Sequence, residues 1–148
     1  MFFVTACGFS PLYTGNNPSR FIGQITIQEP NSQDEFIFYS RLVDHFGQAG
    51  DKYILNYAIT SAKEDRALNF DGTAHRVEIS GSVSFSLKDR EKEIELLYDK
   101  EEMYLSFSNS GSTAAVLNAE RDTNKQLIIL LADKVADRIS LTVVEENL

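Results

Sequence analysis

The feature that most constrains the fold is one change of hydrophobic period along the chain. Between Tyr53 and Phe107, apolar residues recur at every second position, which is typical of strands with one buried face. After Leu117 the spacing changes to threes and fours, which is typical of an amphipathic helix. A turn cluster at 109–112 separates the two patterns. The sequence therefore predicts a sheet followed by one long helix over about residues 113–142.

The alternating region divides into three strands. A polar stretch over 61–72 interrupts the alternation between the first two strands, and the charged residues 88–91 form a turn between the second and third. In the third strand the phase of the alternation shifts, which predicts a β-bulge over 99–102. Strands with short or polar connections are expected to form an antiparallel meander.

A strand and a short helix are predicted before the meander. Residues 21–27 have the composition of a strand, and Pro30 ends it. Ser32 and Glu35 have the spacing of a capping box that begins a helix, and Gly47 suits its C-terminal end. The apolar face expected of this helix consists of Phe36, Tyr39, Val43 and Phe46.

This order of elements predicts an α+β fold. We expect a two-layer sandwich in which two helices cover one face of a four-stranded sheet, because each element has one apolar face. The first strand joins the three-stranded meander through the short helix. A chain of 148 residues suits one domain of this size, and residues 14–20 have the composition of a linker before it.

Charge and motifs exclude several classes of function. The net charge of -8 argues against nucleic acid as a partner. Neither His45 nor His75 has a second ligand at metal-binding spacing, and the chain contains no glycine-rich phosphate loop and no hydrolase motif. No run of about 18 apolar residues is present, so no transmembrane helix is predicted. The sequence predicts a protein that is not an enzyme and binds no metal.

The only cysteine, Cys7, has three alternative explanations. A single buried thiol is often an inert core residue. A catalytic thiolate would need a histidine nearby in space, and no neighbour in the sequence lowers its pKa. The third explanation is lipidation, because Val4-Thr5-Ala6-Cys7 resembles a bacterial lipobox, in which small residues precede the cleavage site and the cysteine receives lipid.

The residues after the cysteine favour lipidation. Cys7-Gly8-Phe9-Ser10-Pro11-Leu12-Tyr13 resembles the start of mature lipopolysaccharide-assembly lipoproteins of the LptE family, and the predicted order of elements is similar to theirs. The resemblance implies that residues 1–6 are the end of an export signal and that 7–20 are a lipidated N-terminus and linker. It also implies an LptE-like domain over 21–148, with the lipid on Cys7 and no separate cofactor.

The resemblance also implies a function in binding and scaffolding. The protein would be anchored by its lipid on the periplasmic side of the outer membrane, where it would plug the LptD β-barrel, assist its assembly and bind lipopolysaccharide (LPS). Two alternatives remain open. One is an auxiliary lipoprotein of a lipid transporter or of a cell-wall synthase, and the other is a soluble small-ligand-binding domain with a free Cys7.

Two sets of side chains are candidates for binding. Cationic side chains pair with phosphates such as those of lipid A, and the candidates are Arg76, Lys88, Arg90 and Lys92. The alternative is that 88–92 is an ordinary solvated turn of mixed charge. Apolar residues outside the core would contact the barrel, and the candidates are Phe9, Leu12, Tyr13, Tyr104 and Phe107.

Overall fold

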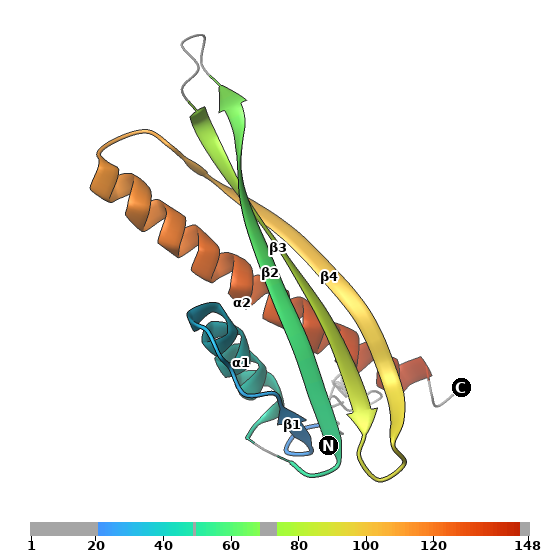
Figure 1. Ribbon diagram of the computed structural model, residues 1–148. Helices are drawn as coiled ribbons and strands as arrows, with labels where there is room; N and C mark the ends of the chain where they lie inside the picture. Colours follow the sequence, from blue (N-terminus) through green and yellow to red (C-terminus); the bar gives the residue numbers. More distant parts are fainter. Residues whose placement is uncertain (1–20, 49, 69–73, 146–148) are drawn as a thin grey trace, which may run out of the picture.

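The computed structural model describes residues 21–48, 50–68 and 74–145 of the chain. Its elements in chain order are β1 (Ile25–Ile27), α1 (Gln33–Phe46), β2 (Tyr53–Leu68), β3 (Ala74–Asp89), β4 (Ile94–Ser108) and α2 (Thr113–Glu145). They form one sheet of order β1-β2-β3-β4, in which β1 is parallel to β2 and the other pairs are antiparallel. Both helices lie on one face of this sheet (Figure 1). The predicted α+β fold and its meander are confirmed.

Helix α1 has the ends that its sequence predicts. The Ser32 side chain accepts a hydrogen bond from the Glu35 amide at 3.2 Å, so it caps the first turn. Gly47 ends the helix with a φ of 80°, and its amide donates to the Val43 carbonyl at 2.8 Å. Strand β1 is shorter than the predicted 21–27, because residues 21–24 adopt turn conformations before the strand begins.

The buried face of α1 differs from the expected one. Phe38, Leu42 and Phe46 are its buried side chains, whereas Phe36 is 61% exposed. Tyr39 and Val43 are only partly buried. Apolar residues occupy two adjacent stripes of this helix, and a 3.6-residue period fits both. The sequence could not show which stripe faces the sheet and α2.

Strand β2 is longer than predicted. It continues through the polar stretch to Leu68, and residues 61–65 remain paired with β3 in unbroken register. The backbone ladder with β3 satisfies the main-chain groups, so the strand persists where apolar alternation stops. Lys63 contacts Glu120 of α2 through an ion pair of 3.0 Å. The change of composition marks where β2 stops contributing apolar side chains to the core, not where the strand ends.

The irregularity in β4 lies nearer the hairpin than predicted. The register shifts between Leu87 and Lys88, whose partners are Leu97 and Glu95, and it is continuous over 97–108. The bulge is therefore at Leu96, and no bulge occurs over 99–102. Asp99 and Glu101 occupy helix-facing positions of β4, where they bind cationic side chains of α2 and so interrupt the apolar alternation.

Helix α2 runs along both ends of the sheet, but its buried side chains are concentrated at the end that contains β1. Its buried side chains begin at Leu127 and continue to Ile139, whereas Leu117, from which the helical spacing was predicted to begin, is 49% exposed. Helix α1 has 14 residues and α2 has 33, so α1 packs beside only part of α2 (Figure 1). The apolar core therefore lies toward the end of the sheet that contains β1.

Candidate functional site

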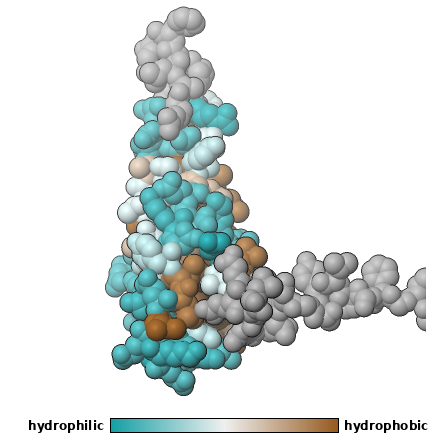
Figure 2. Space-filling model, turned by 90° about the vertical axis from the view of Figure 1, so that its right-hand side faces the viewer, coloured by the Kyte–Doolittle hydropathy of each residue, from teal (hydrophilic) through white to brown (hydrophobic). Residues whose placement is uncertain are grey.

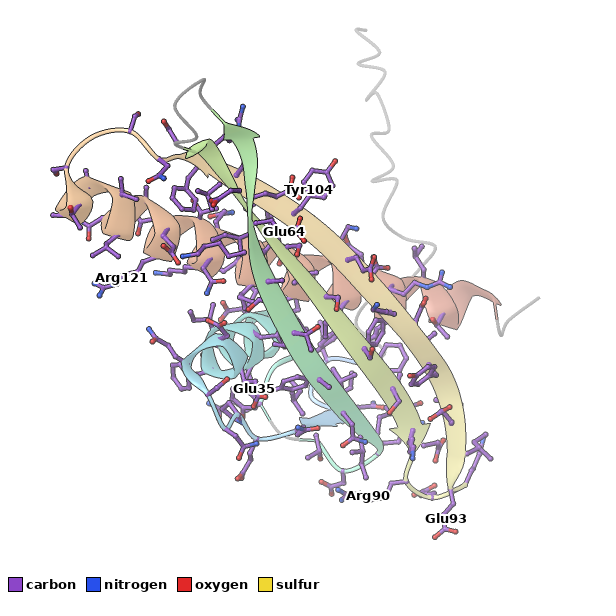
Figure 3. The ribbon with its side chains drawn as sticks, turned by 45° about the horizontal axis from the view of Figure 1, so that its top comes forward. Glu35, Glu64, Arg90, Glu93, Tyr104 and Arg121 are labelled. Carbon is purple, nitrogen blue, oxygen red and sulfur yellow. The ribbon has the colours of Figure 1, made fainter. Side chains whose placement is uncertain are left out.

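The hairpin between β3 and β4 presents the predicted basic cluster. Lys88 is the last exposed residue of β3, and Arg90 and Lys92 are exposed in the turn that follows (Figure 3 labels Arg90). The side chain of Asp89 is buried and accepts hydrogen bonds from the amides of Glu91 and Lys92, both at 3.0 Å. Asp89 therefore fixes the turn that holds these cations together.

A fourth cation joins this cluster in space. The Arg90 amide donates to the Lys52 carbonyl at 2.9 Å, so the residue before β2 lies beside the hairpin. We call Lys52, Lys88, Arg90 and Lys92 the basic end. Sequence analysis did not include Lys52, because only the pairing of β2 with β3 brings it there. Three exposed carboxylates lie on the same hairpin, so its local charge is mixed; they are Glu91, Glu93 and Glu95.

Arg76 lies far from the basic end. Twelve residue steps of about 3.3 Å separate it from Lys88 along β3, which is roughly 40 Å. Its guanidinium Nε donates a hydrogen bond to the Ser106 hydroxyl at 2.8 Å. The four predicted cations therefore do not form one site, and a single phosphate cannot contact both ends of the strand.

The predicted partner-contact residues have different environments. Tyr104 is 70% exposed on the face of β4 away from the helices (Figure 3). Phe107 is buried in the core, because its position in β4 faces the helices, so it is not available to a partner and that expectation was wrong. Cys7 and the other three N-terminal candidates lie outside the described residues; the three are Phe9, Leu12 and Tyr13.

The sheet face that carries no helix has an unusual composition. On β3 its outward positions form a row of four serines, which are Ser80, Ser82, Ser84 and Ser86. On β4, Tyr98 and Tyr104 stand beside this row and are 69% and 70% exposed. We call this surface the open face. Small hydroxyl side chains let another surface approach the sheet closely, and tyrosines are frequent at protein interfaces.

A groove of about 410 Å³ lies where α1 does not cover the sheet. Residues from α1, β2, β3 and α2 line it, among them Asp34, Lys63, Leu117 and Arg121. Asn124 donates a hydrogen bond to Asp34 at 2.9 Å across its wall. The groove joins segments far apart in the sequence, so no local motif could indicate it.

Partly exposed ion pairs link α2 to α1 and to β4. Asp133 of α2 accepts a hydrogen bond from Arg41 of α1 at 2.7 Å and lies 2.6 Å from the His45 ring nitrogen. Burial raises the pKa of Asp133, but the bonds to Arg41 and His45 outweigh it and hold that pKa below its ordinary value. A bond from Arg138 likewise lowers the pKa of Asp99 on β4. These contacts are structural links between elements.

Neither helix is long and apolar enough to cross a membrane. Within 21–48, 50–68 and 74–145, no three side chains of His, Cys, Asp or Glu gather into a group that could hold a metal ion. The geometry of the described residues thus offers binding surfaces, namely the basic end, the open face and the groove.

Comparison with known proteins identifies the family. The family model for LptE, described as lipopolysaccharide-assembly, matches residues 22–139, which is more than half of the chain. The chain belongs to the LptE family. The match includes every element of the fold, from β1 into α2, so the LptE assignment rests on the whole domain and not on the N-terminal heptad. The members of this family are non-enzymatic lipoproteins of LPS assembly.

Solved structures show the same LptE-type fold. The rare lipoprotein B from Shewanella oneidensis is similar with a TM-score of 0.63 and 18% identity, covering 84% of this chain and 98% of that one. The solution structure of lipoprotein B from Nitrosomonas europaea is similar with a TM-score of 0.68 and 13% identity, covering 97% of this chain and 94% of that one. Among curated proteins, no sequence matches this chain.

Proposed function

We propose that this LptE-family chain is an outer-membrane lipoprotein that occupies the LptD barrel and binds LPS during its insertion. The family match over residues 22–139 carries the proposal. The lipid would be attached at Cys7, which is followed by the linker up to residue 20. A lipoprotein cysteine with three acyl chains would anchor the domain stably, since one chain alone binds a membrane only marginally.

Within the proposed complex, the open face is the surface best suited to the barrel. Its serine row carries no charge between Glu78 and Lys88, so close approach buries hydroxyls that can hydrogen-bond to a polar barrel lumen. Tyr104 and Tyr98 add large exposed contact surfaces on the same face. A domain inside a barrel must present both polar and apolar side chains to the barrel wall. Among the described residues, the open face is the face of the sheet that no helix covers.

The basic end is the part of the domain best suited to lipid A phosphates. Changing Lys88, Arg90 and Lys92 together to glutamine is expected to weaken the binding of purified LPS by roughly tenfold, since each exposed ion pair is worth up to about 1 kcal/mol. Binding isotherms at fixed ionic strength measure this effect. The turn itself should persist, because Asp89 and the backbone that hold it are unchanged.

Arg76→Gln is the matched control for that triple variant. It removes an exposed cation from the far end of the same strand, so LPS binding should change by less than about twofold. Equal binding by the triple variant and the unmodified chain would show that 88–92 is only a solvated turn. A loss confined to Arg76→Gln would move the LPS site to the opposite end of β3.

The proposed anchor is tested by mass spectrometry and barrel capture. Expressed from its complete reading frame in a Gram-negative host, the protein is expected to begin at Cys7 with a triacyl mass and to co-purify with LptD. Cys7→Ser is expected to abolish both processing and lipidation, because the lipid requires the thiol. An unmodified chain with a free Cys7 thiol would rule out the lipoprotein proposal, whereas a lipidated chain that captures no barrel would favour an auxiliary lipoprotein.

A further inference from the structure

Strand β4 is the last strand of the sheet, and its outer edge is long. It spans Ile94–Ser108 and pairs only with β3 among the described residues. Fifteen residues is long for an edge strand, and a row of unpaired main-chain groups is a template for another strand. The edge therefore needs either protection or a partner.

The hydrogen bonds of the sheet show which amides of β4 face that edge. The Leu55 carbonyl points toward β1, where it accepts a hydrogen bond from the Gln28 amide at 2.9 Å. The main-chain amides and carbonyls of the even-numbered residues of β2 therefore point the other way, toward β3. Main-chain direction alternates along a strand, and the registers of β2 with β3 and of β3 with β4 carry this alternation across the sheet. The amides and carbonyls that point to the free edge therefore include those of Tyr98, Lys100, Glu102 and Tyr104.

The sequence of this edge is partly symmetric, because five of the nine residues 97–105 are the same when it is read in reverse. Residues 97–105 read Leu-Tyr-Asp-Lys-Glu-Glu-Met-Tyr-Leu, with Glu101 at the centre. An antiparallel pair of two such strands centred on Glu101 would place Lys100 opposite Glu102 of the partner subunit. The same contact would occur twice, because a two-fold axis relates the strands. Opposite charges directly across an antiparallel pair stabilise it, and like charges destabilise it.

Of the other pairs in this arrangement, two join like residues, and one places Asp99, which is bonded to Arg138, opposite the partner's Met103. Tyr98 would lie opposite the partner's Tyr104 on the open face, and Leu97 opposite the partner's Leu105 on the helix-facing side. Glu101 would meet the partner's Glu101 at the axis. Each of these two carboxylates already binds an ammonium, because Lys134 Nζ lies 3.2 Å from Glu101. The central pair is therefore accompanied by two lysines and carries no net charge.

Strand β4 carries three of the seven large hydrophobic side chains that are exposed among the described residues. The three are Ile94, Tyr98 and Tyr104, and a fourth, Leu141, lies near the C-terminal end of α2. Figure 2 views this side and shows a strip of hydrophobic surface among hydrophilic residues. A two-fold axis at Glu101 keeps both helix layers on the same side, so the second copy continues both layers of the sandwich.

We propose that a second copy of this chain pairs antiparallel with the free edge of β4, centred on Glu101, to form a symmetric dimer with one continuous sheet. The self-complementary charges of Lys100 and Glu102 select a second copy over an unrelated strand. The inference does not depend on the proposed function, since it concerns the free domain.

The test measures the mass of the full chain by analytical ultracentrifugation in reducing buffer, which keeps Cys7 from forming a disulfide. The unmodified chain is expected to show a concentration-dependent monomer–dimer equilibrium. Lys100→Glu and Glu102→Lys are each expected to raise the dimer dissociation constant by roughly tenfold or more, because each turns two attractive contacts into repulsive ones. Circular dichroism confirms that both variants are folded.

Mixing the two single variants separates pairing between copies from pairing within one chain. Lys100 and Glu102 also form an ion pair of 2.5 Å within the strand, and each variant loses it. In a mixed dimer, however, the glutamates of the Lys100→Glu chain face the lysines of the Glu102→Lys chain in both contacts. The mixture is therefore expected to dimerise more tightly than either variant alone. A mixture that stays monomeric, or an unmodified chain that stays monomeric at all concentrations, overturns the proposal.

The register has its own test in a Cys7→Ser background. Glu101 would occupy a non-hydrogen-bonded pair, in which the Cα atoms are about 4.5 Å apart and a disulfide fits. Glu101→Cys is expected to form a disulfide-linked dimer under mild oxidation. Met103→Cys is the control, because its partner would lie four residues away along the strand, roughly 13 Å. Equal cross-linking of both variants contradicts this register.

Discussion

Gly50→Ala is expected to lower the free energy of unfolding by about 3 kcal/mol or more. A Cβ at this position would lie 2.2 Å from the Cα of Gln24 and 2.3 Å from its carbonyl carbon. These are main-chain atoms, so no side chain can rotate to relieve the clash. The Gln24 carbonyl also accepts the amides of Lys52 and Tyr53, at 3.2 and 3.0 Å. Moving Gln24 would therefore detach β1 from β2.

Chemical denaturation followed by circular dichroism measures this loss. Gly23→Asn is the matched control, because Gly23 has a φ of 69° but no atom within 4 Å of an added Cβ. Asparagine tolerates that conformation, so we expect a cost of about 1 kcal/mol or less. If Gly50→Ala unfolded at the denaturant concentration of the unmodified chain, the close approach of β1 to the segment before β2 would be incorrect.

Leu131→Ala is expected to cost about 2–5 kcal/mol, as deletion of a fully buried leucine does. Leu131 has no exposed surface and packs where α2 crosses the middle of β3. The contact is close because β3 carries a glycine there: a Cβ on Gly81 would lie 3.0 Å from Leu131 Cδ1. Thermal and chemical unfolding measure the loss. Leu141→Ala, which removes an exposed leucine of the same helix, should cost less than about 0.5 kcal/mol.

The same contact predicts a coupling between the two residues. Gly81→Ala alone should destabilise by about 1–3 kcal/mol, because its methyl would overpack against Leu131 and Leu127. In the Leu131→Ala background that methyl enters the cavity left by the leucine. The double variant should therefore lose less stability than the sum of the two single variants. Strict additivity would show that α2 and β3 do not touch at this point.

Sequence analysis predicted the elements of the fold and their order, because each carries a clear period or cap. It placed the helix after 112 and the cap at Ser32, and both are confirmed. Its errors have physical causes. The polar stretch after residue 60 stays in the sheet because its main-chain pairing with β3 continues after the side chains of β2 become polar. Phe36 belongs to a second apolar stripe, and only the position of α2 decides between the two stripes.

The candidate site was less predictable than the fold. The cations of the hairpin are adjacent in the sequence, so their cluster could be found there, whereas Lys52 joins them only through strand pairing. Phe107 and Tyr104 belong to one alternating pattern, and a shift of one residue in phase reverses which of them is exposed. The bulge at Leu96 sets that phase, and its position depends on the register with β3.

Because the two helices differ in length, the free energy of local unfolding is expected to differ between the two ends of the domain. Near β1, both helices and the sheet share one apolar core, so hydrogen bonds there are expected to break only when the whole domain unfolds. At the far end, β2 projects past α1 with exposed polar side chains over 61–65, and only a few apolar residues are buried there, namely Val77, Ile79 and Phe107. That end is expected to open by local fluctuation while the rest of the domain stays folded. The two ends of one domain would then differ in local stability.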